Sequence, residues 1–341
     1  MQEIIVQGQS GRSRILIGET LANLNRYLPD GRAIIITDEN VARLYADQFP
    51  PVEVITIGSG ETHKTMETLA QIFDRLIAAE ADRSAFIVGI GGGIVGDVTG
   101  FAASTYMRGV RFGFVASTLL AQVDATVGGK NGVNFKGYKN MVGVFCQPEF
   151  VIIDIAMLKT LPPAEIACGL AEIVKHACIA DAVYFDDIET HCDRIAALDA
   201  TTMLRLVQRS VEIKAAVVNA DERESGERRK LNFGHTLGHA FEKTLGISHG
   251  AAVSAGMVLA SELSVRQGLL SPEEFERIKK LLSRLHLPTE LEFDRAAVFD
   301  ALKKDKKRQR AQMHFVLLTG IGRSEVRSIA IEEIGAWLMG R

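Results

Sequence analysis

Two histidines four residues apart, His235 and His239, are the residues of this sequence whose spacing most directly suggests chemistry. On a helix they share one face, so they could hold a metal ion from two points, or supply one ligand and one hydrogen-bonding neighbour. The alternative is a pair of unrelated histidines satisfied in a core. Asn232 and Arg228, one and two turns upstream, would extend the same polar face, and a third histidine follows at His249. We therefore interpret this face as the floor of a ligand site.

The candidate metal ligands are Glu172, His235 and His249, with His239 and His176 as rivals. One carboxylate and two imidazoles bind a zinc-type divalent ion and leave coordination positions open, which is typical of a catalytic site. Spacing alone does not choose between His235 with His249 and His235 with His239. A pair of Glu172 and His176 at i, i+4 is also geometrically possible.

The basic residues near these candidates are more numerous than an apolar ligand would require. Such a set suits a small substrate with two anionic groups, for example a carboxylate held by an arginine and a phosphate held by lysines. The residues are Lys130, Lys175, Lys214, Arg228 and Lys306.

The elements that must position these residues differ between the two halves of the chain. In the first half, short apolar runs at 33–38, 52–57, 85–90, 112–116 and 151–154 are typical of buried parallel strands, and 65–79 has helical periodicity. The second half is mainly helical, at 164–178, 199–220, 251–267 and from Ser271-Pro272 onward, with a short strand at 314–318. We place the domain boundary near residue 155 and expect a polar loop from 121 to 140.

A glycine cluster, Gly91-Gly92-Gly93, follows the run at 85–90 and precedes a helical segment. Strand, glycine turn and helix let backbone N–H groups approach a pyrophosphate at a helix N-terminus. A tight turn without a ligand is the alternative, but the preceding strand–helix units favour nucleotide binding. Ser117-Thr118, after another strand, could reach a cofactor phosphate or ribose. The sequence therefore predicts an α/β Rossmann-like nucleotide-binding domain over 1–155 and a mostly α-helical metal- and substrate-binding domain over 156–341.

Composition excludes several classes of function. The chain has 341 residues, 47% of them hydrophobic and 24% charged, and a net charge of −3, which gives no reason to expect nucleic acid or an anionic membrane as a partner. No apolar run reaches the ~18 residues of a membrane span, and no apolar export segment follows the first charges. The four cysteines lack metal-ligand spacing, so we expect free thiols and a cytoplasmic protein.

Nine motifs, in order from about residue 34 to 320, resemble the 3-dehydroquinate synthase family of sugar-phosphate cyclases. They are Glu61-x-x-Lys64, Gly91-Gly92-Gly93-x-x-Gly96-Asp97, Tyr106-x-Arg108-Gly109, Val123-Asp124-x-x-x-Gly128-Gly129-Lys130, Lys139-Asn140, Gly169-x-Ala171-Glu172-x-x-Lys175-His176, Leu231-Asn232-x-Gly234-His235-Thr236-x-Gly238-His239, His249-Gly250 and Asp305-Lys306-Lys307.

The resemblance implies an NAD- and metal-dependent carbon–oxygen lyase, with Zn²⁺ or Co²⁺ as the metal, acting in the shikimate pathway of aromatic amino-acid biosynthesis. Its substrate would be a phosphorylated keto-acid sugar, 3-deoxy-arabino-heptulosonate 7-phosphate. In that reaction a hydride leaves C5, phosphate is eliminated, the hydride returns, and ring opening with aldol closure gives 3-dehydroquinate. A homodimer is also implied.

By motif, the resemblance assigns Glu172, His235 and His249 to the metal. It assigns His239, Lys130, Asn140 and Lys306 to the substrate phosphate, with Arg108 reaching in from a dimer partner. Lys214 and Arg228 would hold the substrate carboxylate, and Asp124, Lys175 and Asn232 would position the reacting hydroxyls. The NAD site would comprise Asp38, Asn40, Glu61, Lys64, Gly92, Gly93, Asp97, Ser117, Thr118, Lys130, Lys139 and Thr160.

Two departures from the family pattern bear on these assignments. Ala251 stands where the family usually has a glutamate after His249-Gly250, and the loss of a group that supports a metal ligand typically costs ~10–100-fold in affinity. The turn after Lys307 also lacks the family's usual glycine.

Three other functions fit parts of the pattern. A related cyclase acting on another heptulose or hexose phosphate would replace the residues at Lys214 and Arg228, which this chain keeps. A metal-dependent polyol dehydrogenase would need fewer phosphate-binding cations, and a non-catalytic regulator would lack a ligand or base.

Overall fold

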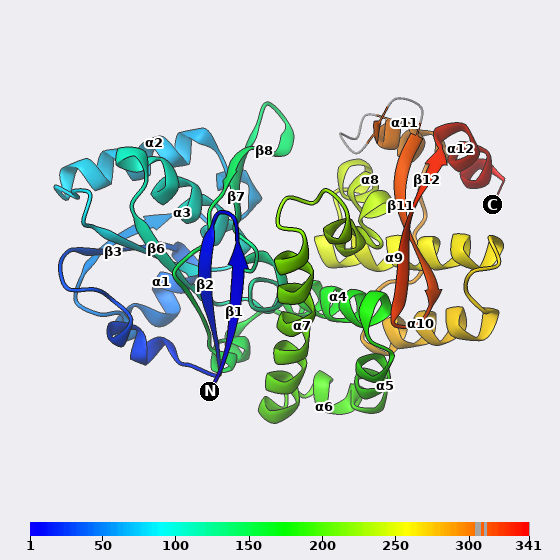
Figure 1. Cartoon of the computed structure of the whole chain (residues 1–341), viewed down its shortest axis with the longest axis horizontal. Helices are drawn as coiled ribbons and strands as arrows, with labels where there is room; N and C mark the ends of the chain where they lie inside the picture. The colour runs from blue at the N-terminus through cyan, green and yellow to red at the C-terminus, as the bar shows by residue number, and fades with distance from the viewer. Residues whose placement is uncertain (304–307, 310–311, 341) are drawn as a thin grey trace. The chain divides into compact units, whose positions relative to one another are not determined.

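The computed structural model describes residues 1–303, 308–309 and 312–340, and they form two compact units (Figure 1). The first unit comprises Met1–Leu161 and Met203–Arg223, and the second comprises Pro162–Thr202 and Glu224–Arg341. This division differs in two ways from the expected boundary at residue 155. The first unit continues to Leu161, and it also includes most of helix α7 (Ala200–Ala220), which lies later in the chain. The amphipathic pattern of that helix showed that it packs on a core but not on which one.

Within the described residues, the first unit contains a seven-stranded sheet in the order β1-β2-β9-β6-β5-β3-β4. The strands from β2 to β4 in this order run parallel, and β1 pairs antiparallel with β2 at the edge. All of the runs expected to be strands are strands, which confirms the α/β class. The strands of this sheet are β1 Gln2–Gly8, β2 Gly11–Ile17, β3 Ala33–Asp38, β4 Glu53–Ile57, β5 Phe86–Gly91, β6 Arg111–Ala116 and β9 Phe150–Ile153.

The strand order creates a switch point between β3 and β5. After β3 the chain first adds β4 on one side and then β5 on the other, so the connections leave the carboxyl ends of these two strands in opposite directions. In open parallel sheets, ligands bind in the crevice at such a point. Asp38 ends β3, and Gly91 ends β5 directly before helix α3 (Gly93–Thr105). The topology thus places two expected NAD segments at one edge of the sheet.

The helices of the first unit follow from local signals. Helix α2 (Met66–Ala78) begins after Thr65, whose hydroxyl accepts a hydrogen bond from the Thr68 backbone N–H, and buries Leu69, Ile72 and Leu76. Helix α1 (Glu39–Tyr45) begins after Asp38, whose side chain accepts from the N–H groups of Asn40 and Val41.

The expected loop at 121–140 is wrong. It contains a helical turn at Ala121–Ala125 and most of a hairpin of β7 (Lys130–Phe135) and β8 (Tyr138–Phe145). No residue of β8 is buried, and its first four residues are all exposed, so the part of the strand within this range lacks the alternating burial typical of a strand.

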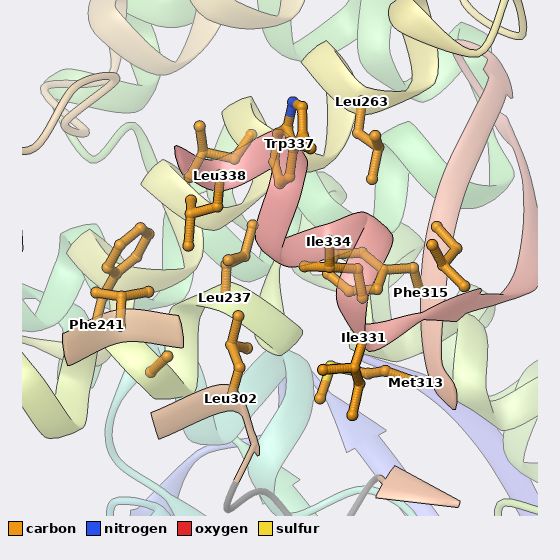
Figure 2. Packing of buried hydrophobic residues seen from close by; sticks show 14 of the residues in the cluster. Leu237, Phe241, Leu263, Leu302, Met313, Phe315, Ile331, Ile334, Trp337 and Leu338 are labelled. Atoms are coloured by element: carbon orange, nitrogen blue, oxygen red, sulfur yellow. The ribbon is translucent and has the colours of Figure 1, made fainter. Parts of the chain in front are cut away.

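The second unit is mostly helical, as expected, and is completed by a small sheet. Its core includes Leu237, Phe315, Trp337 and Leu338, drawn from α8, β11 and α12 (Figure 2). Strand β12 and helix α12 were missed by the sequence reading. The described elements are α4 Pro163–Ala180, α5 Ala182–Thr190, α6 Cys192–Ala196, α8 His235–Leu245, α9 His249–Arg266, α10 Pro272–Arg284, α11 Arg295–Lys303, β10 Arg308–Gln309, β11 Gln312–Gly320, β12 Arg323–Ala330 and α12 Ile331–Met339.

Glycines allow α4, α8 and α9 to approach backbone to backbone. A Cβ on Gly256 of α9 would lie 2.0 Å from the carbonyl oxygen of Gly234, and a Cβ on Gly250 would lie 2.5 Å from the Cα of Cys168 on α4. Both of these are backbone atoms, which cannot move aside as the end of a flexible side chain can. These contacts bring the start of α8 and the middle of α4 each against α9. Among the described residues, no helix is both long and apolar enough to span a bilayer.

Glu222, just after α7, ties this helix to the sheet of the first unit. Its carboxylate accepts hydrogen bonds from the N–H groups of Gln9 (2.7 Å) and Ser10 (3.1 Å) and from Nε2 of Gln147 (2.9 Å). Burial raises the pKa of the Glu222 carboxyl, but its hydrogen bonds with Ser10, Gln147 and Gln9 together outweigh burial, so the pKa lies below its ordinary value.

We predict that Glu222→Gln lowers the stability of the protein at pH 7 by about 1.5–3 kcal/mol, the range for hydrogen bonds to a charged group. Because the folded-state pKa is lowered, this contribution is complete above the ordinary glutamate pKa and is lost as the pH falls through the folded-state pKa. Thermal unfolding midpoints of wild type and variant should therefore converge on acidification. A gap that stays constant from pH 7 downward, or one matched by the exposed control Glu276→Gln, would contradict this role.

Candidate functional site

Three side chains of the second unit, Glu172, His235 and His249, converge. Each offers one potential ligand atom, and these atoms lie within 4.8 Å of one another. Oε1 of Glu172 is 3.3 Å from Nε2 of His235 and 3.2 Å from Nε2 of His249. Glu172 is fully buried on α4, whereas the two histidines are the first residues of α8 and α9. The close packing at Gly250 and Gly256 is what holds these three positions together.

The histidines do not continue a helix from Asn232. Arg228 and Asn232 lie on a separate 3₁₀ helix, η7 (Glu227–Asn232), and Gly234 adopts a left-handed conformation (φ 76°) before α8 begins at His235. The expectation of one polar helical face running from Arg228 to His239 is therefore wrong. A glycine at this position ends one helix and redirects the chain, because it takes positive φ without steric cost.

Each imidazole is oriented through its second nitrogen. Nδ1 of His235 lies 3.1 Å from the carbonyl oxygen of Phe233, and Nδ1 of His249 lies 2.6 Å from Oε1 of Glu242. Acceptors at Nδ1 fix the proton there and leave the Nε2 lone pair for a metal ion. Glu242 on α8 thus supplies a carboxylate to His249 although residue 251 is alanine. Sequence reasoning missed Glu242: the spacing places it on the same helix face as His235, seven residues on, but does not show its contact with His249 on α9.

The charges around the imidazoles favour a cation between them. Glu172 pairs with the ammonium of Lys175, one turn along α4. Burial lowers the pKa of His235, with the Glu172 charge opposing it. Burial also lowers the pKa of His249, but Glu172 and Glu242 outweigh it and raise the pKa to about 10. A buried carboxylate and two Nε2 atoms aimed at one point are the donor set of a catalytic divalent-metal site, so these residues fit the expected ion.

The rival histidines occupy different positions. The ring of His239 meets that of His235 edge-on, with centroids 5.5 Å apart. Among the described residues, no cluster of three potential ligand atoms within 4.8 Å includes His239. His176 is fully buried on α4. Sequence spacing had left these alternatives open, and the geometry favours His249 as the partner of His235.

The remaining candidates of the second unit lie near the expected metal ligand His235 in sequence. Asn232 donates a hydrogen bond to the carboxylate of Glu224, a residue held at positive φ, and Arg228 is 3% exposed. Glu224 was not among the expected residues. Lys306 lies outside the described residues.

In the first unit, several of the expected NAD residues lie at the carboxyl ends of parallel strands: Asp38 at β3, Gly92 and Gly93 after β5, and Ser117 and Thr118 after β6. A Cβ on Gly92 would lie 2.9 Å from Cγ2 of Thr118, and one on Gly93 would lie 2.9 Å from Cβ of Ala125, so only glycine keeps the start of α3 open. Ser117 is buried directly before Thr118. An open helix N-terminus beside a hydroxyl residue fits the pyrophosphate of a dinucleotide.

Two buried lysines of the first unit, Lys64 and Lys214, form ion pairs with aspartates. The Lys64 ammonium pairs with Asp97 and donates to Oδ1 of Asn140 (2.6 Å). Lys214 on α7 pairs with Asp124, with 2.7 Å between Nζ and Oδ1. Burial raises the pKa of Asp97, and the charge of Lys64 opposes this.

The other predicted residues of the first unit lie at strand or helix ends. Asn40 donates to Ser59 (3.1 Å), and Thr160 bonds the hydroxyl of Tyr45 (2.7 Å). All six residues of this group are exposed, namely Asn40, Thr160, Glu61, Arg108, Lys130 and Lys139.

Comparison with known proteins follows the same motifs. A model described as the 3-dehydroquinate synthase N-terminal region matches residues 54–168, and the corresponding C-terminal model matches residues 169–308. The chain belongs to the 3-dehydroquinate synthase-like family of sugar-phosphate cyclases. The two models together match residues 54–308 without a break.

Solved structures of the same superfamily cover the whole chain. A 2-deoxy-scyllo-inosose synthase complexed with carbaglucose-6-phosphate, NAD⁺ and Co²⁺ is 26% identical, with a TM-score of 0.88 and 99% of each chain covered. The 2-epi-5-epi-valiolone synthase ValA from Streptomyces hygroscopicus subsp. jinggangensis 5008, with NAD⁺ and Zn²⁺ bound, is 29% identical, with a TM-score of 0.88 and 100% of this chain and 97% of that chain covered. A probable glycerol dehydrogenase from Sinorhizobium meliloti 1021 (16% identity, TM-score 0.67, covering 96% and 94%) shares the fold alone.

We predict that Glu242→Ala lowers the affinity of the protein for Zn²⁺ by about 10–100-fold, because His249 loses the acceptor that orients it. Alanine keeps the helix propensity of α8, so the fold should persist. A competition titration of metal-stripped protein against a chromophoric chelator would measure the effect. The matched control is Glu276→Ala, an exposed position on α10. Equal Zn²⁺ affinity in wild type and Glu242→Ala would show that His249 is not held through this carboxylate.

Proposed function

We propose that the protein is a 3-dehydroquinate synthase that converts 3-deoxy-arabino-heptulosonate 7-phosphate to 3-dehydroquinate and phosphate, with NAD and a divalent metal, Zn²⁺ or Co²⁺, as cofactors. The convergence of Glu172, His235 and His249 carries the proposal, because it supplies the metal site of the family on this chain's own residues. The NAD⁺ and Co²⁺ or Zn²⁺ in the related cyclase structures support the cofactors.

When bound, NAD would accept and return a hydride, and the metal would polarise the hydroxyl that is oxidised. The protein's own groups would bind and orient the substrate. Glu172, His235 and His249 would hold the ion, and the pair Lys175–Glu172 would keep the carboxylate charged in its buried position. Asn232, oriented by Glu224, would hold a substrate hydroxyl.

The substrate phosphate and carboxylate would be held by separate cations. His239, Lys130, Asn140 and Lys306 are assigned to the phosphate, which is also the leaving group. Arg108 is exposed in the first unit and would contribute to the phosphate site of a second copy in a homodimer.

Arginine at 228 and lysine at 214 favour the carboxylated substrate over those of related cyclases. A guanidinium binds a carboxylate through two parallel hydrogen bonds, and removing such a charged pair costs about 1.5–3 kcal/mol. The second candidate function is a cyclase for a heptulose or hexose phosphate without the carboxylate, because the similar 2-deoxy-scyllo-inosose synthase is complexed with carbaglucose-6-phosphate.

The assay that tests the proposal follows phosphate release from the heptulosonate phosphate with NAD below stoichiometric amounts. We expect many turnovers per NAD, no net NADH, loss of activity on chelation and recovery with Zn²⁺ or Co²⁺. Turnover in metal-free protein would contradict the metal site. Preference for a heptulose or hexose phosphate would favour the second candidate, and net NADH from a simple polyol would indicate a dehydrogenase.

Arg228→Ala provides the internal control for substrate choice. It should raise KM for the carboxylated substrate by about tenfold to a hundredfold while the metal affinity stays unchanged. Lys230→Ala, on the same short helix, removes only an exposed ion pair with Glu227 and should leave KM as it is.

A further inference from the structure

The β7–β8 hairpin is irregular at one point. Val133 pairs with Val142, and Phe135 pairs with Tyr138, so Lys139, Asn140 and Met141 all lie opposite Asn134 alone. Extra residues in one strand break the ladder and re-aim side chains, and such bulges occur next to functional sites. Here the extra residues include the Lys139-Asn140 motif, so the bulge sets the direction of a motif assigned to ligands.

Asn134 fills the gap in the ladder with its side chain. Its Oδ1 accepts a hydrogen bond from the backbone N–H of Asn140 (2.9 Å), and its Nδ2 donates to Oε1 of Glu61 (2.8 Å). Its own backbone N–H donates to the carbonyl oxygen of Lys64 (2.8 Å) instead of to β8. One residue thereby joins the hairpin to both ends of the Glu61-x-x-Lys64 motif.

The hydrogen bond from the Asn140 N–H to Asn134 also affects where the side chain of Asn140 lies. This residue is held at φ 51°, a left-handed conformation that asparagine tolerates better than most residues. In that conformation its Oδ1 accepts from the Lys64 ammonium, which also pairs with Asp97. The bond from Asn134 to the Asn140 N–H therefore stabilises the backbone conformation on which the contact with Lys64 depends.

We propose that Asn134 is a positioning residue that orients Glu61 of the expected NAD site and Asn140 of the expected phosphate site without touching either ligand itself. This inference rests on the proposed function, which gives those two residues their ligands. An amide suits the position because Nδ2 supplies a donor to Glu61 while Oδ1, on the same group, supplies an acceptor to the Asn140 N–H. Aspartate would place a second carboxylate against Glu61. Serine would lose one of the two side-chain hydrogen bonds, and alanine would lose both.

Asn134→Ala tests the inference. It removes both side-chain bonds but keeps the backbone bond to Lys64, so the melting temperature should change little. The loss of the two side-chain hydrogen bonds of Asn134 should change the equilibrium constant for NAD binding about tenfold. The dissociation constant of NAD, measured by calorimetry, should therefore rise about tenfold. Hydrogen–deuterium exchange should become faster in peptides that contain Asn140. Tyr138→Ala, an exposed position on the same hairpin, is the control and should alter neither quantity.

A charge exchange separates the two contacts. Asn134→Asp alone should bind NAD at least as weakly as Asn134→Ala at neutral pH, because two carboxylates then face each other. Adding Glu61→Gln restores a donor opposite the new carboxylate, so the slow exchange around Asn140 should return. The inference would be overturned if Asn134→Ala matched the wild type in both NAD affinity and hydrogen–deuterium exchange. It would also be overturned if exchange became faster in this variant while the NAD affinity stayed unchanged. A wild-type protein that bound no NAD would instead overturn the proposed function.

Discussion

The burial of the Glu172 carboxylate is the constraint on which the second unit depends. An ionised carboxylate removed from water is costly by several kcal/mol unless charged or polar partners surround it. Here Lys175 pairs with one oxygen and the Nε2 atoms of His235 and His249 face the other. Helices α4, α8 and α9 must therefore meet at one point, and the glycine contacts at positions 250 and 256 make that approach possible.

The helix starts impose a second electrostatic condition. His235 and His249 are the first residues of their helices, where the helix dipole disfavours a positive charge by about 0.3–1 kcal/mol. Hydrogen bonds to charged groups are worth about 1.5–3 kcal/mol each, so Glu172 and Glu242 outweigh the dipoles. At His249 the two carboxylates also outweigh burial and raise the pKa to about 10, whereas at His235 burial prevails over the charge of Glu172 and lowers the pKa. A site that attracts a proton so strongly through two carboxylates is also one that attracts a divalent cation.

Much of this arrangement could be predicted from the sequence, because apolar runs and glycines carry strong local signals. The parallel strands, the glycine turn after β5, the helix that holds Glu172 and the helix that follows His249 all follow from such patterns. The kink at Gly234 could not be predicted, since a helical spacing of polar residues does not show that the chain turns between them. The roles of Glu242 and Asn134 could not be predicted either, because each depends on a contact between segments that periodicity does not relate. Strand β8 was missed because it has no buried face.

The central claim is that one carboxylate and two imidazoles of the helical unit bind a single divalent ion. X-ray absorption spectroscopy of the zinc-loaded protein tests it most directly, because it reports the kinds of atoms bound to the metal without an assumption about substrate. The account predicts two imidazole ligands with oxygen completing the coordination, and the loss of one imidazole contribution in His249→Ala. A sulfur ligand, or an unchanged spectrum in that variant, would contradict it.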